Sequence, residues 1–418
     1  MNKKSMKRRY LEISLTLLLL AVLAYVLFRI NGESSKYIIR ITKLCAINVV
    51  LALSMNLVQG FTGIFSLGHA GFMAIGAYAV ALLTIPVKKK ATIFMLEPLI
   101  APLDNLTLPF WAALIIGGLL AAGAAFIIGL PCLRLRGDYL AIATLGFSEI
   151  IRIVITNAQS LTNGAQGLKS IPATSIWWAY GVALATIVFI ALFISSSHGR
   201  ALKAIREDEI AAESMGVPLL KTKMMSFMIS AFLAGVGGGL YASYIGTIGP
   251  DVFQISRTYD ILMIVVMGGM GSISGSVIAA FIVTIGQEWL RVLDGPLTWI
   301  PFWPQDGVAG MRMVVFSLLL LIIILFFRNG LFGNREVTWS SVIDRLSGLA
   351  GSRKAKAPAA PAQPEVSQSL QEISRSLKDI SRSLKQGGQV PEEAGQALKE
   401  IYATLEEIGQ APKEVGDK

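Results

Sequence analysis

Few side chains in this sequence could form a catalytic or metal-binding centre. The chain has two histidines, His69 and His198, and two cysteines, Cys45 and Cys132. Two histidines cannot build a histidine-based metal cage, and neither cysteine has a metal ligand at the spacing found in zinc sites. No serine or cysteine lies in a recognisable nucleophile motif. We therefore expect no catalytic residue, no metal and no cofactor in this chain.

The stretch closest to a nucleotide-binding motif is 164–170, with the sequence GAQGLKS. A phosphate-binding loop carries its lysine directly after the second glycine. Here Leu168 separates Gly167 from Lys169, so the motif fails. If this protein uses ATP, another chain must hydrolyse it.

The most informative polar stretch is 195–218, where apolar and charged residues alternate at helical spacing before Gly216 and Pro218. This pattern predicts a short amphipathic helix that ends at Gly216. The helix could lie on the lipid surface or dock on another protein. An acidic cluster at 207–213 would face an anionic leaflet unfavourably, whereas a protein groove can pair with it. The charge pattern favours docking.

The composition indicates that most of the chain lies in a bilayer. Hydrophobic residues make up 54% of it and charged residues 15%, and the mean hydropathy is +0.61. Soluble domains have about 25% charged residues, so an ordinary soluble enzyme is excluded. The formal charge of +10 does not indicate nucleic-acid binding, because the basic residues cluster at the ends of apolar segments.

The apolar segments predict an all-α, polytopic membrane protein. The segment 259–290 is interrupted by the glycine-rich run 268–275, which should break its helix into two short spans or a re-entrant pair. We expect about eight full spans in addition to this broken helix pair. The full spans are predicted at 11–28, 38–58, 64–85, 108–130, 139–155, 176–194, 224–248 and 308–327.

Basic residues suggest that both termini are cytoplasmic. A basic N-terminus at 1–10 precedes an uncleaved first helix, and the loop 198–218 lies on the same side. The lysines at 88–90 disagree with this layout because they would face outward. The predicted membrane domain is 11–335. It is followed by a linker at 336–365 and, at 366–411, by a heptad-patterned cytoplasmic tail. The tail forms amphipathic or coiled-coil helices or is mostly disordered.

Four motifs together resemble a known family. The segments 60–78, 133–147, 199–216 and 267–276 look like those of LivM-type permeases of branched-chain amino-acid ABC importers, and the likeness covers about 44–333. The resemblance implies a bacterial or archaeal inner-membrane subunit. Its implied partners are a second related permease, two ATPase subunits and an extracytoplasmic binding protein.

The resemblance assigns the loop 198–218 to coupling with the ATPase subunits. Ile210 stands where the family motif has its glutamate, and Glu209 lies one place earlier. The implied substrates are branched-chain amino acids, with urea or short amides as an alternative. The residues implied in coupling are Arg200, Arg206, Asp208, Glu209, Ala211, Ala212 and Gly216.

A stand-alone secondary carrier is the rival from another class. It would need ionisable residues inside the spans, and the sequence offers few beyond Glu149 and Arg152, which are spaced to pair on one helix face. We expect Arg257 and Asp260 to be interfacial. Close helix packing or gating could explain several glycines, and His69 could have a structural or a pathway role. The candidate pathway or gating residues are Gly68, His69, Gly237, Gly238, Gly271 and Gly275.

Overall fold

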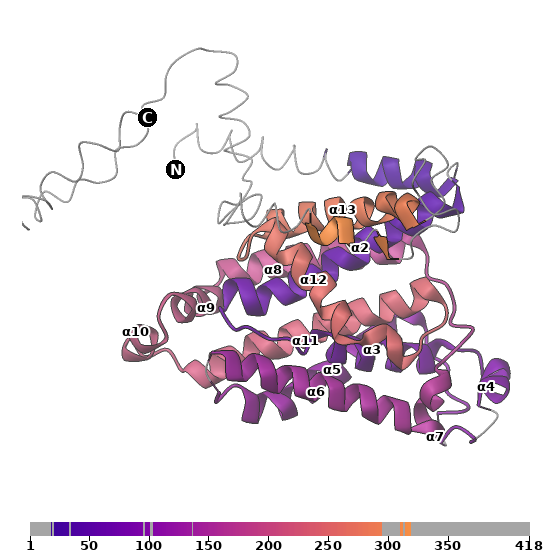
Figure 1. Ribbon diagram of the computed structural model, residues 1–418, viewed down its shortest axis with the longest axis horizontal. Coiled ribbons are helices and arrows are strands. Elements are labelled where there is room, and N and C mark those ends of the chain that lie inside the picture. The colour runs from indigo at the N-terminus through magenta and orange to yellow at the C-terminus, as the bar shows by residue number, and fades with distance from the viewer. Residues whose placement is uncertain are drawn as a thin grey trace, which may run out of the picture. The chain divides into compact units, whose positions relative to one another are not determined.

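The computed structural model describes residues 18, 21–32, 35–94, 97–100, 103–135, 137–294, 310–311 and 314–318 (Figure 1). Within these ranges the regular structure is helical, with one isolated antiparallel bridge between Leu168 and Ile248. The all-α prediction is confirmed for this part of the chain. The predicted basic N-terminus, linker and heptad tail, half of the span 11–28 and most of the span 308–327 lie outside the described residues.

The described helices follow one another along the chain with short connections. A short apolar helix at Ala21–Gly32 precedes the labelled elements. These are α2 (Lys36–Asn56), η1 (Leu57–Phe61), α3 (His69–Thr84), α4 (Val87–Ile93), α5 (Phe110–Cys132), α6 (Asp138–Asn157), α7 (Gln159–Thr162), η2 (Gly164–Gln166), α8 (Ile176–Ser195), α9 (Ser197–Glu207), α10 (Glu209–Ser214), α11 (Leu219–Ile245), η3 (Pro250–Phe253), α12 (Ile255–Gly268), α13 (Ile273–Trp289) and η4 (Leu290–Asp294).

Five of the described helical segments are long and apolar enough to cross a membrane, and a sixth crossing results if α3 and α4 count as one span bent by 119°. The predicted total of eight stays a prediction, because half of the predicted span 11–28 and most of 308–327 fall outside the described residues. The five segments are Lys36–Phe61, α5, α6, α8 and α11.

The predicted span 64–85 differs in the structure. Its helix begins only at His69, because residues 62–68 are non-helical and Gly63 has a φ of +75°. The preceding span runs on instead through the π-helix η1 to Phe61. As a result, α3 is 16 residues long and extends about 24 Å, less than the ~30 Å hydrocarbon core.

The predicted break in 259–290 is confirmed. Helix α12 ends at Gly268 and α13 begins at Ile273. Gly269 and Gly271 between them have φ values of +102° and +86°, which glycine adopts without steric cost. The Ser272 hydroxyl caps α13 by accepting a hydrogen bond from the amide of Gly275 at 3.0 Å.

Helix α11 is central to the bundle and packs against α2, α3 and α5. In Figure 1, α8 and α13 lie to one side of α11, and α5 and α6 lie to the other. Helices α9 and α10 are at one end of the bundle, and α4 and α7 are at the opposite end. The loop 198–218 and the lysines at 88–90 are therefore at opposite ends, as the predicted topology requires.

One of those three lysines has a structural role. Lys90 is 3% exposed, and its Nζ donates hydrogen bonds to the carbonyl oxygens of Leu103 and Leu106 at 2.6 and 2.7 Å. These hydrogen bonds from the charged Nζ hold the connection between α4 and α5 in place. This explains part of the disagreement between 88–90 and the charge pattern of the other loops.

Candidate functional site

The loop between α8 and α11 forms two short helices where the sequence predicts one. Helix α9 ends at Glu207, and Asp208 has extended backbone angles. The Asp208 carboxylate accepts hydrogen bonds from the amides of Ile210 and Ala211 at 2.8 and 3.0 Å, so it caps the N-terminus of α10. A chain reversal follows at Gly216, whose φ is +82°. The prediction of one continuous helix is wrong because an aspartate in its middle starts a new one.

The two helices have different surroundings. Leu202 and Ile205 of α9 are buried, and Leu202 packs in an apolar cluster with Leu57 and Phe61 of η1. In α10, by contrast, only Ala212 is buried. Helix α9 is thus attached to the bundle, whereas α10 projects from it (Figure 1).

The projecting part of the loop exposes apolar side chains. Ile210 is 72% exposed and Met215 is 85% exposed, with the exposed acidic Glu213 between them. Exposed apolar groups rimmed by charge are typical of a protein-binding surface. Ala211 and Gly216 are exposed on the same segment, and Arg200 is exposed on α9.

Two of the candidate coupling residues point into the protein. The Arg206 Nη1 donates a hydrogen bond to the carbonyl oxygen of Gly60 in η1 at 2.9 Å. The Glu209 carboxylate pairs with Lys223 of α11 at 2.6 Å, and that lysine side chain is 8% exposed. The structure therefore uses Arg206 and Glu209 to hold the loop against the bundle.

Asn56 joins α2 to the break between α12 and α13. Its side chain is fully buried at the end of α2. Its Oδ1 accepts a hydrogen bond from the Gly271 amide at 2.8 Å, and its Nδ2 donates to the Ser272 carbonyl oxygen and the Ser276 hydroxyl, each at 2.9 Å. The sequence analysis missed this residue. A buried asparagine within the apolar run 45–58 is a signal that could have indicated it.

The Arg206 and Asn56 contacts meet at one place. A Cβ atom on Gly271 would lie 2.6 Å from Arg206 Nη1, and the missing Cβ of Gly60 leaves room for both Asn56 and Gly271. A cavity of about 390 Å³ adjoins this point and is lined by Gly60, Arg206 and Met270, among others. The structure thus brings together two candidate residues, Arg206 and Gly271. A third, Gly275, lies in α13 and packs against Gly268 at the end of α12.

The other candidate glycines and His69 make packing contacts. Gly238 faces the Met73 carbonyl oxygen, Gly237 faces Leu51, and Gly68 faces the backbone of Thr144. The His69 ring is 6% exposed, and its Nε2 lies 2.8 Å from the Ser54 hydroxyl. These contacts allow α2, α3, α6 and α11 to pack closely against one another.

The predicted pair in α6 is confirmed. Arg152 Nε donates to a carboxylate oxygen of Glu149 at 2.7 Å, three residues away on the same helix. Arg257 is placed differently from the prediction, because it contacts Asn48 in the interior of α2 and not the end of the bundle. Glu149 and Arg152 thus neutralise each other on one helix, whereas Arg257 contacts residues of α2 and α11.

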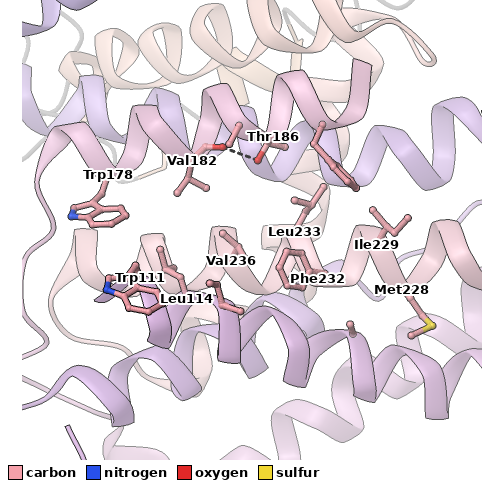
Figure 2. A pocket seen from close by; sticks show the side chains of 14 residues that line it. Trp111, Leu114, Trp178, Val182, Thr186, Met228, Ile229, Phe232, Leu233 and Val236 are labelled. Atoms are coloured by element: carbon pink, nitrogen blue, oxygen red, sulfur yellow. Dashed lines mark hydrogen bonds between the residues drawn. The ribbon is translucent and has the colours of Figure 1, made fainter. Parts of the chain in front are cut away.

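An apolar groove of about 540 Å³ lies between α5, α8 and α11. Figure 2 shows Trp111 and Trp178 close together on α5 and α8, with Phe232 and Val236 of α11 between these two helices. The only hydroxyl in its lining, that of Thr186, donates to the Val182 carbonyl oxygen at 2.9 Å (Figure 2). The groove therefore suits hydrocarbon, and no charged side chain is among its lining residues.

Sequence comparison identifies proteins that are similar to this chain. Residues 37–325 match the family model described as the branched-chain amino acid transport system permease component. The chain is 34% identical over 321 residues to the high-affinity branched-chain amino acid transport system permease protein LivM of Escherichia coli, covering 66% of this chain and 71% of the relative.

More distant relatives include a probable LivM permease from Methanocaldococcus jannaschii, 22% identical with 72% of this chain and 95% of the relative covered. An autoinducer 2 import permease, LsrC of an Enterobacter strain, is 28% identical over 48% of this chain and 60% of its own length. The extent of the family match and the identity to LivM show that the chain belongs to the family of branched-chain amino acid transport permeases.

Proposed function

We propose that this chain is the LivM-type subunit of an ATP-driven importer for branched-chain amino acids. It would work in the inner membrane of a bacterium or archaeon with a second related permease, two ATPase subunits and an extracytoplasmic binding protein. Both termini and the loop 198–218 would be cytoplasmic, and the eight predicted spans with the broken pair would form the membrane domain. The family match over 37–325 supports this proposal.

The construction of the loop 198–218 carries the proposal. Helix α10 exposes Ile210 and Met215 where another protein can bind, and α9 is fixed to η1 through Leu202 and Arg206. A force applied to the projecting helix is therefore passed to the membrane domain through short, directional contacts. Since the sequence lacks a phosphate-binding loop, ATP would be hydrolysed by the partner subunits.

Motion of α9 can reach the break between α12 and α13 by a route of named contacts. From Arg206 the route passes to Gly60, then to Asn56, and from Asn56 to the break between α12 and α13. Helix breaks of this kind are positions where transporters change shape around their substrate. The proposed mechanism is a shift of α9 that moves η1 and the α12–α13 break together.

The test compares the chain alone with the assembled complex in proteoliposomes. We expect no ATP hydrolysis by the isolated chain, and ATP-dependent uptake of leucine by the complex supplied with binding protein. A complex whose ATPase subunits carry a catalytic-site substitution is the control, and it should lose uptake. Leucine uptake by the isolated chain that follows a proton or sodium gradient would favour a secondary carrier. Uptake of urea, but not leucine, by the complex would favour the amide alternative.

A further inference from the structure

Arg257 is a cation deep in the bundle, although it belongs to the first turn of α12. Its Nη2 donates a hydrogen bond to Asn48 Oδ1 at 3.3 Å. Asn48 lies eight residues before Asn56 and twelve after Lys36, so the contact is about 12 Å and 18 Å from the two ends of α2. Ionisable side chains at such depth are costly in a membrane protein and commonly mark a solute pathway.

The hydrogen-bonding capacity of this guanidinium is only partly used. It has five N–H donors, and among the described residues its contacts are the long hydrogen bond to Asn48, the Asp260 carboxylate at 3.6 Å, and the face of the Tyr241 ring at 4.4 Å. Its Nε is buried, and no described residue accepts a hydrogen bond from it. An additional anionic acceptor would complete the site, and a carboxylate matches a guanidinium best.

Asp260 adds the opposite charge next to Arg257. It lies three residues further along α12, and its side chain is 45% exposed, against 15% for the arginine. A half-exposed carboxylate at this depth is unfavourable against hydrocarbon. Of the two charged groups, Asp260 is the more accessible.

A second cation lies nearer the end of α2. Arg40 is 5.5 Å from the centre of the Tyr244 ring, and Tyr244 stacks on Tyr241 with 6.0 Å between ring centres. The two arginines and two tyrosines thus form a row from the start of α2 towards its middle. This row gives an anion a favourable approach to Arg257.

We propose that Arg257 and Asp260 form a binding site for the charged end of a free α-amino acid. Arg257 would bind the carboxylate and Asp260 the ammonium group, which sit on one carbon atom of the zwitterion and so match a neighbouring donor and acceptor. Asn48 and Tyr241 position the arginine. This inference rests on the proposed function, because it names the part of the substrate that the permease itself recognises. The apolar groove in Figure 2 has no group for this task.

The test measures ligand binding to the importer in nanodiscs, without binding protein, by saturation-transfer difference NMR. Three ligands share one carbon skeleton: leucine, 4-methylpentanoate, which lacks the ammonium, and 3-methylbutylamine, which lacks the carboxylate. Asp260→Asn should weaken leucine and the amine about tenfold or more and leave the acid unchanged. Arg257→Gln should weaken leucine and the acid and leave the amine unchanged.

Glu149→Gln is the matched control, because it removes one charge of the other i,i+3 pair in the spans. It should leave binding of all three ligands and basal ATP hydrolysis unchanged. Absence of saturable leucine binding in the unmodified importer, or an equal loss for all three ligands in Asp260→Asn, would overturn the inference and assign the pair a structural role. If the importer with Arg257→Gln fails to assemble, the ligand binding of the Asp260→Asn variant still tests the inference. If the unmodified complex shows no ATP-driven leucine uptake, the proposed function is refuted instead.

Discussion

Replacing Asn56 with alanine removes the side chain that joins α2 to the break between α12 and α13. The Gly271 amide loses its acceptor, whereas the Ser272 carbonyl oxygen and the Ser276 hydroxyl each lose one hydrogen bond and keep the one between them at 3.0 Å. Each buried group left without a hydrogen bond costs about 1–3 kcal/mol. Since Asn56 is fully buried, water does not readily replace it. We therefore expect the break to be destabilised locally by about 1–3 kcal/mol.

A local loss of this size is measurable at the break itself. It corresponds to an increase of about 5- to 150-fold in the population of its open form. Hydrogen–deuterium exchange of peptides covering 267–276 should accelerate accordingly, and leucine transported per ATP should fall because α2 loses its hydrogen bonds to the break between α12 and α13. The exchange of α5 and α6 should stay as it is.

Ser226→Ala is the control for this variant. Ser226 is also fully buried, but its hydroxyl donates only to the Lys223 carbonyl oxygen of its own helix, at 3.0 Å. It should change neither exchange at 267–276 nor the transport ratio. Unchanged exchange and unchanged transport per ATP in Asn56→Ala would refute the proposed link between the loop and the break.

Three further substitutions test other parts of the structure. Ile210→Asp should weaken binding of the ATPase subunits in a pull-down without lowering the melting temperature of the chain, because the side chain is exposed on α10; full binding would contradict a docking role. Gly238→Val should destabilise the bundle by at least about 1–3 kcal/mol, seen as a lower melting temperature, since even its Cβ would overlap the Met73 carbonyl oxygen. Lys90→Met should make the connection at 94–109 more sensitive to proteolysis, whereas Lys88→Met should not, and equal sensitivity of both variants would show that the buried lysine does not order this loop.

Much of the architecture could be predicted from local sequence. Apolar segments of sufficient length indicated the membrane and most of the observed spans, because hydropathy is a property of each segment by itself. The glycine-rich run 268–275 indicated the break that separates α12 from α13, since glycines at positive φ end helices wherever they are packed. The pair Glu149 and Arg152 was predicted correctly for the same reason, as both residues lie on one helix face.

The contacts of the candidate-site residues depended on which helices pack together. Glu209 is one of the acidic residues implied in coupling, and only the tertiary structure shows that its carboxylate also pairs with Lys223 of α11. Asn56 has no sequence neighbour that explains it, because its partners follow it by more than 200 positions in the chain. Arg257 was expected at an interface, and only the packing of α12 on α2 places it beside Asn48.

The sequence by itself determined that most of this protein lies in a bilayer, that it is helical, that α12 and α13 are separated by a break, and which family motifs it contains. The tertiary structure decided the partners of its polar side chains and the depth of its charges. The physical reason is that hydropathy, glycine conformation and i,i+3 spacing act within one helix, whereas buried hydrogen bonds and ion pairs join helices that are far apart in the sequence. A sequence pattern shows properties that act within one helix, but it does not show which distant helices share a hydrogen bond or an ion pair.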